Sequence, residues 1–264
     1  MKEKILQNLT TECPWRDTLY WYDTIHSTNT QAKQLAKEGA PHGTVLIAGH
    51  QSGGRGRMGR SFASAEGMGV YLSVILRPDC APDQLMHLTC AAGVAMLEAV
   101  ENTCGLQPQI KWINDLVVGK QKLGGILTEM SLDNGMVDYA VIGIGINCLQ
   151  TAQDFPPELR DLAISLTMAT EQTVLPEKLA AAMIESLWKM SLQLFSQKAS
   201  LMERYKRHCI TLGKEIQVLR ADSVRPGKAI DLDDDGGLLV EYPDDTVETI
   251  SSGEVSVRGM YGYL

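Results

Sequence analysis

Residues 122–147, KLGGILTEMSLDNGMVDYAVIGIGIN, contain two strand-like runs joined by a tight turn. The runs 122–132 and 136–147 are rich in β-branched and other apolar residues, which favour strands. Asp133, Asn134 and Gly135 lie between them, and a turn of this composition between apolar runs is a strong local signal of a hairpin. The stretch therefore predicts a long β-hairpin.

Other strands and helices are expected on both sides of this hairpin. Ser-Thr-Asn at 27–29 favours a helix start, and Gly39 favours the end of that helix. Pro176, a favoured first-turn residue, opens a long helical pattern. The expected strands cover residues 18–25, 44–50, 70–78, 110–114 and 116–118, and the expected helices cover residues 30–37, 82–103 and 176–208.

The sequence changes character after residue 212. Short β-like runs follow one another: EIQVL, KAIDL, GLLVEY, VETIS and EVSVR. Turn-forming residues at 234–237 and 244–245 separate some of them. This pattern predicts a small β-barrel or sandwich, so the chain divides into a larger domain at 1–212 and a β domain at 213–264.

Composition limits the class of protein. The chain has 264 residues, 44% of them hydrophobic, which is enough for one sizeable core and a small appended domain. Its net charge of −8 argues against general binding to nucleic acid or anionic membranes. The N-terminus lacks the apolar core of a signal peptide, and residues 88–100 are too short to span a bilayer. The six cysteines and five histidines are scattered, so we expect reduced thiols in a cytoplasmic protein and no zinc site.

A loop rich in glycine and arginine, GGRGRMGR at residues 53–60, interrupts this acidic sequence. Glycine lets backbone N–H groups approach an anion closely, and arginine adds a permanently charged, forked donor for carboxylate or phosphate. Taken alone, the loop could equally be a solvated surface segment. It is not a nucleotide-binding P-loop, because Arg60 stands where that motif needs lysine and a strand follows instead of a helix.

Three shorter motifs combine glycine, lysine and polar residues. KWIND, residues 111–115, places an amide and a carboxylate at a strand end, either as turn residues or as ligands of a nucleotide and Mg²⁺. KLGGIL, residues 122–127, and GIGIN, residues 143–147, place glycines inside strands, where they mark close approach by a ligand, a bulge or tight packing. Lys122 would bring positive charge to a ligand, although an edge-strand lysine also discourages aggregation.

Each motif taken alone can be explained without a functional site, but the occurrence of all of them in this order cannot. Together they resemble the biotin–protein ligases. The motifs are Ser-Thr-Asn at 27–29, Gln-x-x-Gly-Arg-Gly-Arg-x-Gly-Arg at 51–60, Lys-Trp-x-Asn-Asp-Leu at 111–116, Lys-Leu-x-Gly-Ile-Leu at 122–127 and Gly-x-Gly-Ile-Asn at 143–147. The resemblance resumes more weakly at 236–240 and 252–258.

The resemblance implies an α+β fold. A mixed or antiparallel sheet covered by helices, as in class II synthetases, would carry a small C-terminal SH3-like β-barrel. Biotin and ATP would be substrates, with Mg²⁺, and the acceptor would be a lysine of a biotin carboxyl carrier protein. The matched core begins near residue 18 and leaves no room for the N-terminal DNA-binding domain of some members. We therefore expect a ligase without repressor function and without DNA or membrane partners, and leave a homodimer open.

The family also implies roles for individual residues. The positions expected to bind biotin are Ser27, Thr28, Asn29, Gln51, Arg55, Gly56, Arg57, Lys122, Gly125, Leu127, Gly143 and Gly145. The positions expected to serve ATP are Arg60, Phe62, Asn114, Asp115 and Asn147, with Asp115 as a candidate Mg²⁺ ligand. Lys122 and Arg57 are the catalytic candidates. Three positions depart from the family. Ile113 replaces a usual proline, which questions the rigidity of that turn, Phe62 replaces a tryptophan found in some members, and Gly124 replaces a common alanine.

Two other functions remain open at this point. A lipoate–protein ligase would share the fold and the adenylate strategy, and the Gly-Arg-Gly-Arg loop favours biotin over it. A biotin sensor without catalysis would bind the ligand but form no adenylate. The ligase hypothesis requires Arg57, Lys122 and residues 143–147 to meet at one cleft.

Overall fold

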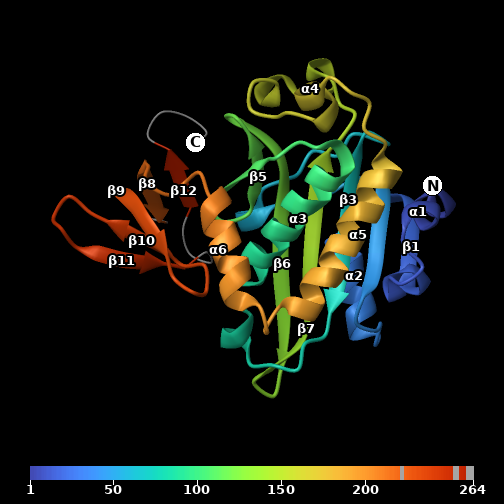
Figure 1. Ribbon diagram of the computed structural model, residues 1–264, viewed down its shortest axis with the longest axis horizontal. Coiled ribbons are helices and arrows are strands. Elements are labelled where there is room, and N and C mark those ends of the chain that lie inside the picture. Colours follow the sequence, from blue (N-terminus) through green and yellow to red (C-terminus); the bar gives the residue numbers. More distant parts are fainter. Residues whose placement is uncertain (221–222, 252–255, 260–264) are drawn as a thin grey trace.

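The computed structural model describes residues 1–220, 223–251 and 256–259, in which two separate sheets form (Figure 1). The larger sheet has seven strands. In spatial order they are β1 (Leu19–Ile25), β2 (Thr44–Gln51), β3 (Gly69–Leu76), β7 (Met136–Asn147), β6 (Gln121–Asp133), β5 (Asp115–Val118) and β4 (Gln109–Lys111). β1 and β2 are parallel and the other neighbours are antiparallel. The prediction of a mixed or antiparallel sheet is therefore confirmed, and the sheet is mixed.

The predicted hairpin is confirmed as β6 and β7. Asp133 pairs with Met136, which leaves a two-residue turn of Asn134 and Gly135. Their φ angles are 49° and 81°, the left-handed conformation that such a turn requires and that Asn-Gly adopts at low cost. Because β6 pairs with β5 and β7 with β3, the hairpin joins the two halves of the sheet.

Helices cover both faces of the large sheet. On one face, α3 (Leu88–Cys104), α5 (Pro176–Gln193) and α6 (Lys198–His208) contribute to the main apolar core. On the other, α2 (Thr28–Lys37) packs Ala32 and Ala36 against residues of β2, β3 and β7. Coverage on both faces explains why β3 is buried along its whole length.

Short elements complete the large unit. They are α1 (Lys2–Asn8), α4 (Leu166–Thr170) and 3₁₀ turns at Pro14–Thr18, Arg57–Gly59, Pro82–Leu85, Ala152–Asp154 and Pro157–Leu159. The helix expected over 82–103 begins with one of these turns and becomes α-helical at Leu88. The strand expected over 110–114 ends at Lys111.

The prediction of one helix over 176–208 is wrong. The chain turns between α5 and α6, where the buried ring of His87 hydrogen-bonds the Leu194 carbonyl oxygen at 2.8 Å. That carbonyl is satisfied by a distant side chain, and Gln197 leaves helical geometry with φ −121°. No glycine or proline lies at 194–197, so the sequence carries no local signal of the break.

The smaller sheet is antiparallel throughout. Its strands, in spatial order, are β11 (Val247–Ile250), β10 (Leu238–Glu241), β9 (Ser223–Leu232), β8 (Glu215–Arg220) and β12 (Ser256–Gly259). Residues 254 and 255 of the last predicted run lie outside the described residues. The sheet begins just after the predicted boundary at residue 212, and the assignment of 213–264 as a separate SH3-like domain stays a prediction.

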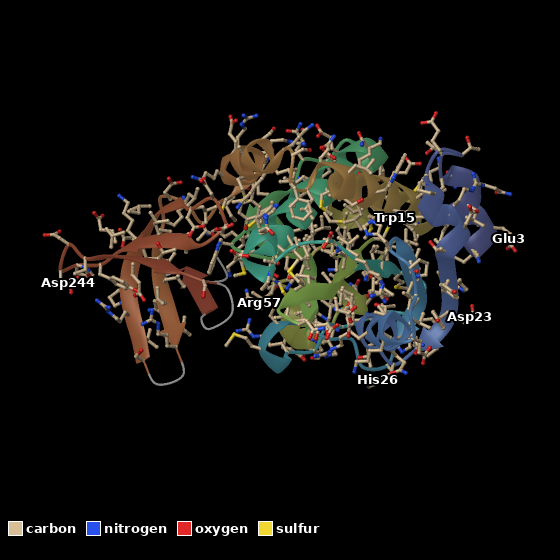
Figure 2. The ribbon with its side chains drawn as sticks, turned by 90° about the horizontal axis from the view of Figure 1, so that it is seen from below. Glu3, Trp15, Asp23, His26, Arg57 and Asp244 are labelled. Carbon is tan, nitrogen blue, oxygen red and sulfur yellow. The ribbon has the colours of Figure 1, made fainter. Side chains whose placement is uncertain are left out.

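The turn between β9 and β10 contacts the large unit. Trp112 Nε1 donates a hydrogen bond of 2.9 Å to the Gly236 carbonyl oxygen. Lys206 of α6 and Asp231 of β9 form a second contact between the two units, an ion pair at 2.9 Å. Figure 2 shows Arg57 on the part of the large unit nearest the small sheet. Within the described ranges, no helix is long and apolar enough to cross a bilayer.

Candidate active site

A cavity of about 650 Å³ opens on the large sheet beside the Gly-Arg loop. The sites expected from the sequence come together there, since every residue predicted to bind biotin or ATP lines this cavity. They are Ser27, Thr28, Asn29, Gln51, Arg55, Gly56, Arg57, Arg60, Phe62, Asn114, Asp115, Lys122, Gly125, Leu127, Gly143, Gly145 and Asn147. The cleft required by the ligase hypothesis therefore exists.

An apolar wall of the cavity was missed by sequence reasoning. It consists of Phe155, Leu159, Leu162 and Ala163, which follow β7. Backbone hydrogen bonds hold this segment against the start of β6: Lys122 N–H donates to the Leu162 carbonyl at 2.7 Å, and Ile164 N–H donates to the Lys122 carbonyl at 2.9 Å. The apolar residues spaced through 155–163 were the available signal.

Lys122 forms an ion pair inside the cavity. Its Nζ lies 2.7 Å from Asp115 Oδ1, and the two side chains are 29% and 18% exposed. The pair spans adjacent strands, because β5 and β6 run antiparallel with a register shift between Leu116 and Val117. An ammonium at the cavity wall is thus held by a carboxylate that a ligand phosphate or carboxylate can replace.

Arg57 reaches the same wall from the Gly-Arg loop. Its guanidinium donates to Asn114 Oδ1 at 3.1 Å, and the Asn114 amide donates to the Ile126 carbonyl at 3.0 Å. Burial lowers the pKa of Arg57, while the negative charge of Asp115 opposes that shift. An arginine stays charged at neutral pH even so. The wall therefore presents two cations, Arg57 and Lys122, whose partners Asn114 and Asp115 are adjacent in the chain.

The turn at Ile113 is tied on both sides. The peptide bond between Trp112 and Ile113 is cis. Trp112 N–H donates to Thr211 Oγ1 at 2.9 Å, and the buried Tyr205 hydroxyl donates to the Ile113 carbonyl at 3.0 Å. Contacts from distant residues therefore hold this turn where the family usually has proline.

At the opposite end of the cavity, hydroxyl and amide groups bond to one another. Gln51 Oε1 accepts the Thr28 N–H at 2.8 Å and lies 3.1 Å from Thr28 Oγ1. The buried Ser73 Oγ lies 2.8 Å from Thr28 Oγ1 and 2.6 Å from Asn29 Oδ1. Ser73 and the groups behind Asn29 were not predicted, because they lie far away in sequence.

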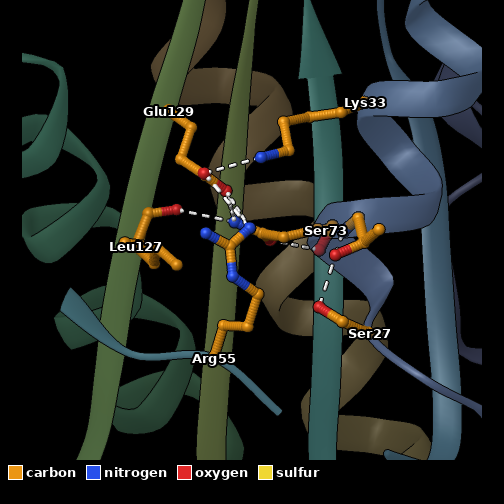
Figure 3. Close-up of polar contacts among 8 residues, drawn as sticks. Ser27, Lys33, Arg55, Ser73, Leu127 and Glu129 are labelled. Carbon is orange, nitrogen blue, oxygen red and sulfur yellow. Dashed lines mark hydrogen bonds and ion pairs between the residues drawn. The ribbon is translucent and has the colours of Figure 1, made fainter. Parts of the chain in front are cut away.

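Asn29 also contacts a charged cluster centred on Glu129 of β6, which Figure 3 shows with Lys33 and Arg55. Asn29 Nδ2 donates to Glu129 Oε2 at 3.1 Å, and Lys33 Nζ lies 2.7 Å from Glu129 Oε1. Arg55 reaches the same carboxylate at 3.3 Å. Burial alone would raise the pKa of Glu129, but the hydrogen bonds from Lys33 and Asn29 and the positive charges outweigh it, so the pKa is lowered.

The strand glycines make room for protein side chains. A Cβ on Gly143 would lie 1.8 Å from Asn29 Oδ1, and a Cβ on Gly145 would lie 2.6 Å from the Phe62 ring. Close approach by a ligand, a bulge and tight packing were the expected explanations for these glycines. The contacts show tight packing against Asn29 of α2 and against Phe62, so glycine is required here even without a ligand. That a side chain at these positions would also collide with the ligand stays a prediction.

Comparison with known proteins agrees with this geometry. Residues 21–147 match the biotin/lipoate A/B protein ligase family, and residues 211–258 match the biotin protein ligase C terminal domain. The bifunctional ligase/repressor BirA of Bacillus subtilis is 34% identical over 240 residues, which are 90% of this chain and 74% of that protein. The chain belongs to the biotin protein ligase family.

Further matches support this assignment to an enzyme family. The biotin–[acetyl-CoA-carboxylase] ligase of Mycobacterium tuberculosis is 32% identical, over 87% of this chain and 85% of that protein. The structure of the Aquifex aeolicus biotin protein ligase in complex with biotin and ATP superposes with a TM-score of 0.77 at 27% identity. The superposition covers 92% of this chain and 99% of the Aquifex aeolicus chain. This chain is therefore a biotin ligase enzyme, and its fold is that of the family.

Proposed function

We propose that this biotin ligase joins biotin and ATP into biotinyl-5′-AMP and then transfers the biotinyl group to a lysine of a biotin carboxyl carrier protein. One observation carries the proposal: the Lys122–Asp115 and Arg57–Asn114 pairs lie in one cavity with the polar groups around Thr28. At one end the cavity offers hydroxyl and amide groups beside Arg55, whose charge Glu129 balances, and at the other it offers Lys122 and Arg57. Biotin has a neutral ureido ring and a carboxylate, so it matches both ends.

In the first step, a biotin carboxylate oxygen attacks the α-phosphorus of ATP. The bond from that phosphorus to the bridging oxygen breaks, and pyrophosphate leaves. Negative charge grows on the phosphoryl oxygens, and Lys122 and Arg57 stabilise it as preorganised cations. No covalent protein nucleophile is needed, because positioning and charge stabilisation suffice for such a transfer.

Mg²⁺ fits the oxygen donors of this wall. Asn114 and Asp115 present an amide and a carboxylate oxygen, and Mg²⁺ is usually bound by one or two carboxylates together with substrate phosphates. In the described ranges, no group of three or more His, Cys, Asp or Glu residues gathers for a metal. Bound with ATP, the ion would neutralise charge on the phosphates and on the leaving pyrophosphate.

In the second step, a neutral lysine amine of the carrier attacks the acyl carbon of the adenylate. The bond to the phosphate oxygen breaks, AMP leaves, and the new amide nitrogen loses a proton. Water would compete for the same carbon, so the cavity must stay closed until the carrier arrives. The Gly-Arg loop, anchored through Arg55 and Arg57, and the apolar wall at 155–163 supply that cover.

Biotin-dependent exchange of labelled pyrophosphate into ATP tests the proposal directly. The wild-type chain should catalyse exchange with biotin and not with lipoate. Exchange with lipoate alone would favour a lipoate ligase, and biotin binding without exchange would favour a sensor. Transfer is then measured with a purified carrier protein and with the same carrier lacking its acceptor lysine.

A further inference from the structure

We propose that Glu129, which does not line the cavity, is a positioning residue for biotin and acts through Asn29 and Ser73 on Thr28. The inference rests on the proposed function and deepens it, because it assigns the direction of the hydrogen bonds that meet the ureido ring. The chain of contacts runs from β6 through α2 to β3.

The first link fixes the amide of Asn29. Its Nδ2 faces two acceptors, Glu129 Oε2 at 3.1 Å and the Leu127 carbonyl at 3.3 Å (Figure 3). A carboxylate only accepts when ionised, and the lowered pKa of Glu129 keeps it ionised at neutral pH. The amide nitrogen must therefore point toward β6, and Oδ1 must point toward Ser73.

The second link fixes the proton of Ser73. This side chain is fully buried, and its Oγ lies 2.6 Å from Asn29 Oδ1 and 2.8 Å from Thr28 Oγ1. A hydroxyl has one proton to donate. Asn29 Oδ1 carries no proton and can only accept, whereas the Thr28 hydroxyl can also donate. The Ser73 proton therefore goes to Asn29.

The third link reaches the ligand. With Ser73 Oγ left as an acceptor, the Thr28 proton goes either to Ser73 or to Gln51 Oε1, which lies at 3.1 Å. In both arrangements the proton stays within the protein. Thr28 Oγ1 then offers a lone pair to the cavity and accepts a hydrogen bond from the ligand. A ureido N–H is such a donor. Glu129 favours this contact because it directs the Ser73 proton to Asn29 and keeps it off Thr28 Oγ1, whose lone pairs stay available to the ligand.

The variants Glu129→Ala and Glu129→Gln test whether Glu129 acts on Thr28 through Asn29 and Ser73, here called the relay, or has only a structural role. Alanine removes the closer of the two acceptors of the Asn29 amide, leaving only the Leu127 carbonyl, and should raise KM for biotin about tenfold. KM for ATP and the unfolding midpoint should change little. Glutamine retains an acceptor oxygen, so its KM for biotin should stay within about threefold of wild type. Ser73→Ala removes the middle link and should resemble Glu129→Ala.

Glu98→Ala is the matched control, because Glu98 pairs with Arg204 outside the cavity and should leave KM for biotin unchanged. The relay is overturned if Glu129→Ala raises KM for biotin no more than this control. It is also overturned if both KM values rise together or if glutamine is as damaging as alanine. Should the wild type show no exchange, the proposed function itself fails. Calorimetric titration with biotin then decides the relay, and equal affinity of wild type and Glu129→Ala overturns it.

Discussion

The two ends of the cavity are built differently. At the Thr28 end, hydroxyl and amide groups on secondary-structure elements bond to one another, and Ser73, Thr28 and Asn29 are all buried. At the Lys122 end, partly exposed cations pair with Asp115 and Asn114, and Arg57 comes from a loop. One end is complete before a ligand arrives, whereas the other holds partners that a ligand must replace.

This difference separates recognition from chemistry. A closed network of short contacts keeps its geometry, so it can select a ligand by shape and hydrogen-bond direction. A cation held by a protein carboxylate is kept near its working position and is released when phosphate takes over that contact. The cavity therefore combines a rigid recognition end with an exchangeable catalytic end, and substitutions should affect the two ends differently.

The largest effect is expected from Lys122→Ala at the exchangeable end. Loss of the ammonium should cost at least about 2 kcal/mol of transition-state stabilisation in adenylation, or about thirtyfold in rate. Biotin-dependent pyrophosphate exchange measures it. Lys120→Ala is the control, because Lys120 is exposed in the adjacent turn and does not line the cavity. Exchange at the wild-type rate in Lys122→Ala would remove Lys122 from the chemistry.

Gly143→Ala and Gly145→Ala compare the two ends directly. The new methyl at 143 meets Asn29, which is held by Ser73, Leu127 and Glu129 and cannot move aside. Overpacking there should cost about 2 kcal/mol of unfolding free energy and weaken biotin binding.

The methyl at 145 meets the outer edge of the half-buried Phe62 ring, which lies on a loop and can shift. Gly145→Ala should therefore lose less stability. Denaturant unfolding and biotin titration of both variants measure this order. Equal losses would mean that the loop end is as rigid as the other.

Arg57→Gly should act later in the reaction, on retention of the adenylate. Removing the guanidinium breaks its bond to Asn114 and takes one cation from the phosphate, so release should be about tenfold faster. The free adenylate would then label lysines of a bystander protein, which a streptavidin blot detects. Arg57→Lys keeps the positive charge but lacks the two parallel N–H donors of the guanidinium, so its release rate should lie between those of wild type and Arg57→Gly. Unchanged release would exclude this loop as a cover.

Much of this fold follows from local sequence. The turn at Asn134 and Gly135 needs left-handed backbone at both positions, which few other residue pairs adopt cheaply, so the hairpin was predictable. Ser27 was predictable as a helix cap, because a serine oxygen can accept a free N–H of the first helical turn. Its side chain accepts from the Thr30 N–H. The motif residues of the cavity were identified by resemblance, and their placement in one cavity agrees with it.

The missing parts depend on contacts between distant residues. Ser73 is one small polar residue in a strand that otherwise looks like core, and only the fold brings Asn29 against it. Glu129 resembles an ordinary solvent-facing strand residue until Lys33 and Arg55 approach it. The break at Leu194 depends on the ring of His87, more than 100 residues earlier. No periodicity or turn signal in one segment contains such information.

The smallest expected effect tests whether the Glu129 cluster is already formed without ligand. The folded-state pKa of Glu129 is below its ordinary value of 4.5, so its stabilising contribution is fully present above that value. It is lost as pH falls through the folded pKa, because protonation removes the charge that Lys33 and Arg55 face. The free energy of unfolding should therefore differ between wild type and Glu129→Gln by less than about 1 kcal/mol at pH 7, with the difference shrinking below pH 4.5. Denaturant titrations across that range measure it. A difference independent of pH would mean that the carboxylate gains nothing from its cations before biotin binds, and that the recognition end, too, is completed only by the ligand.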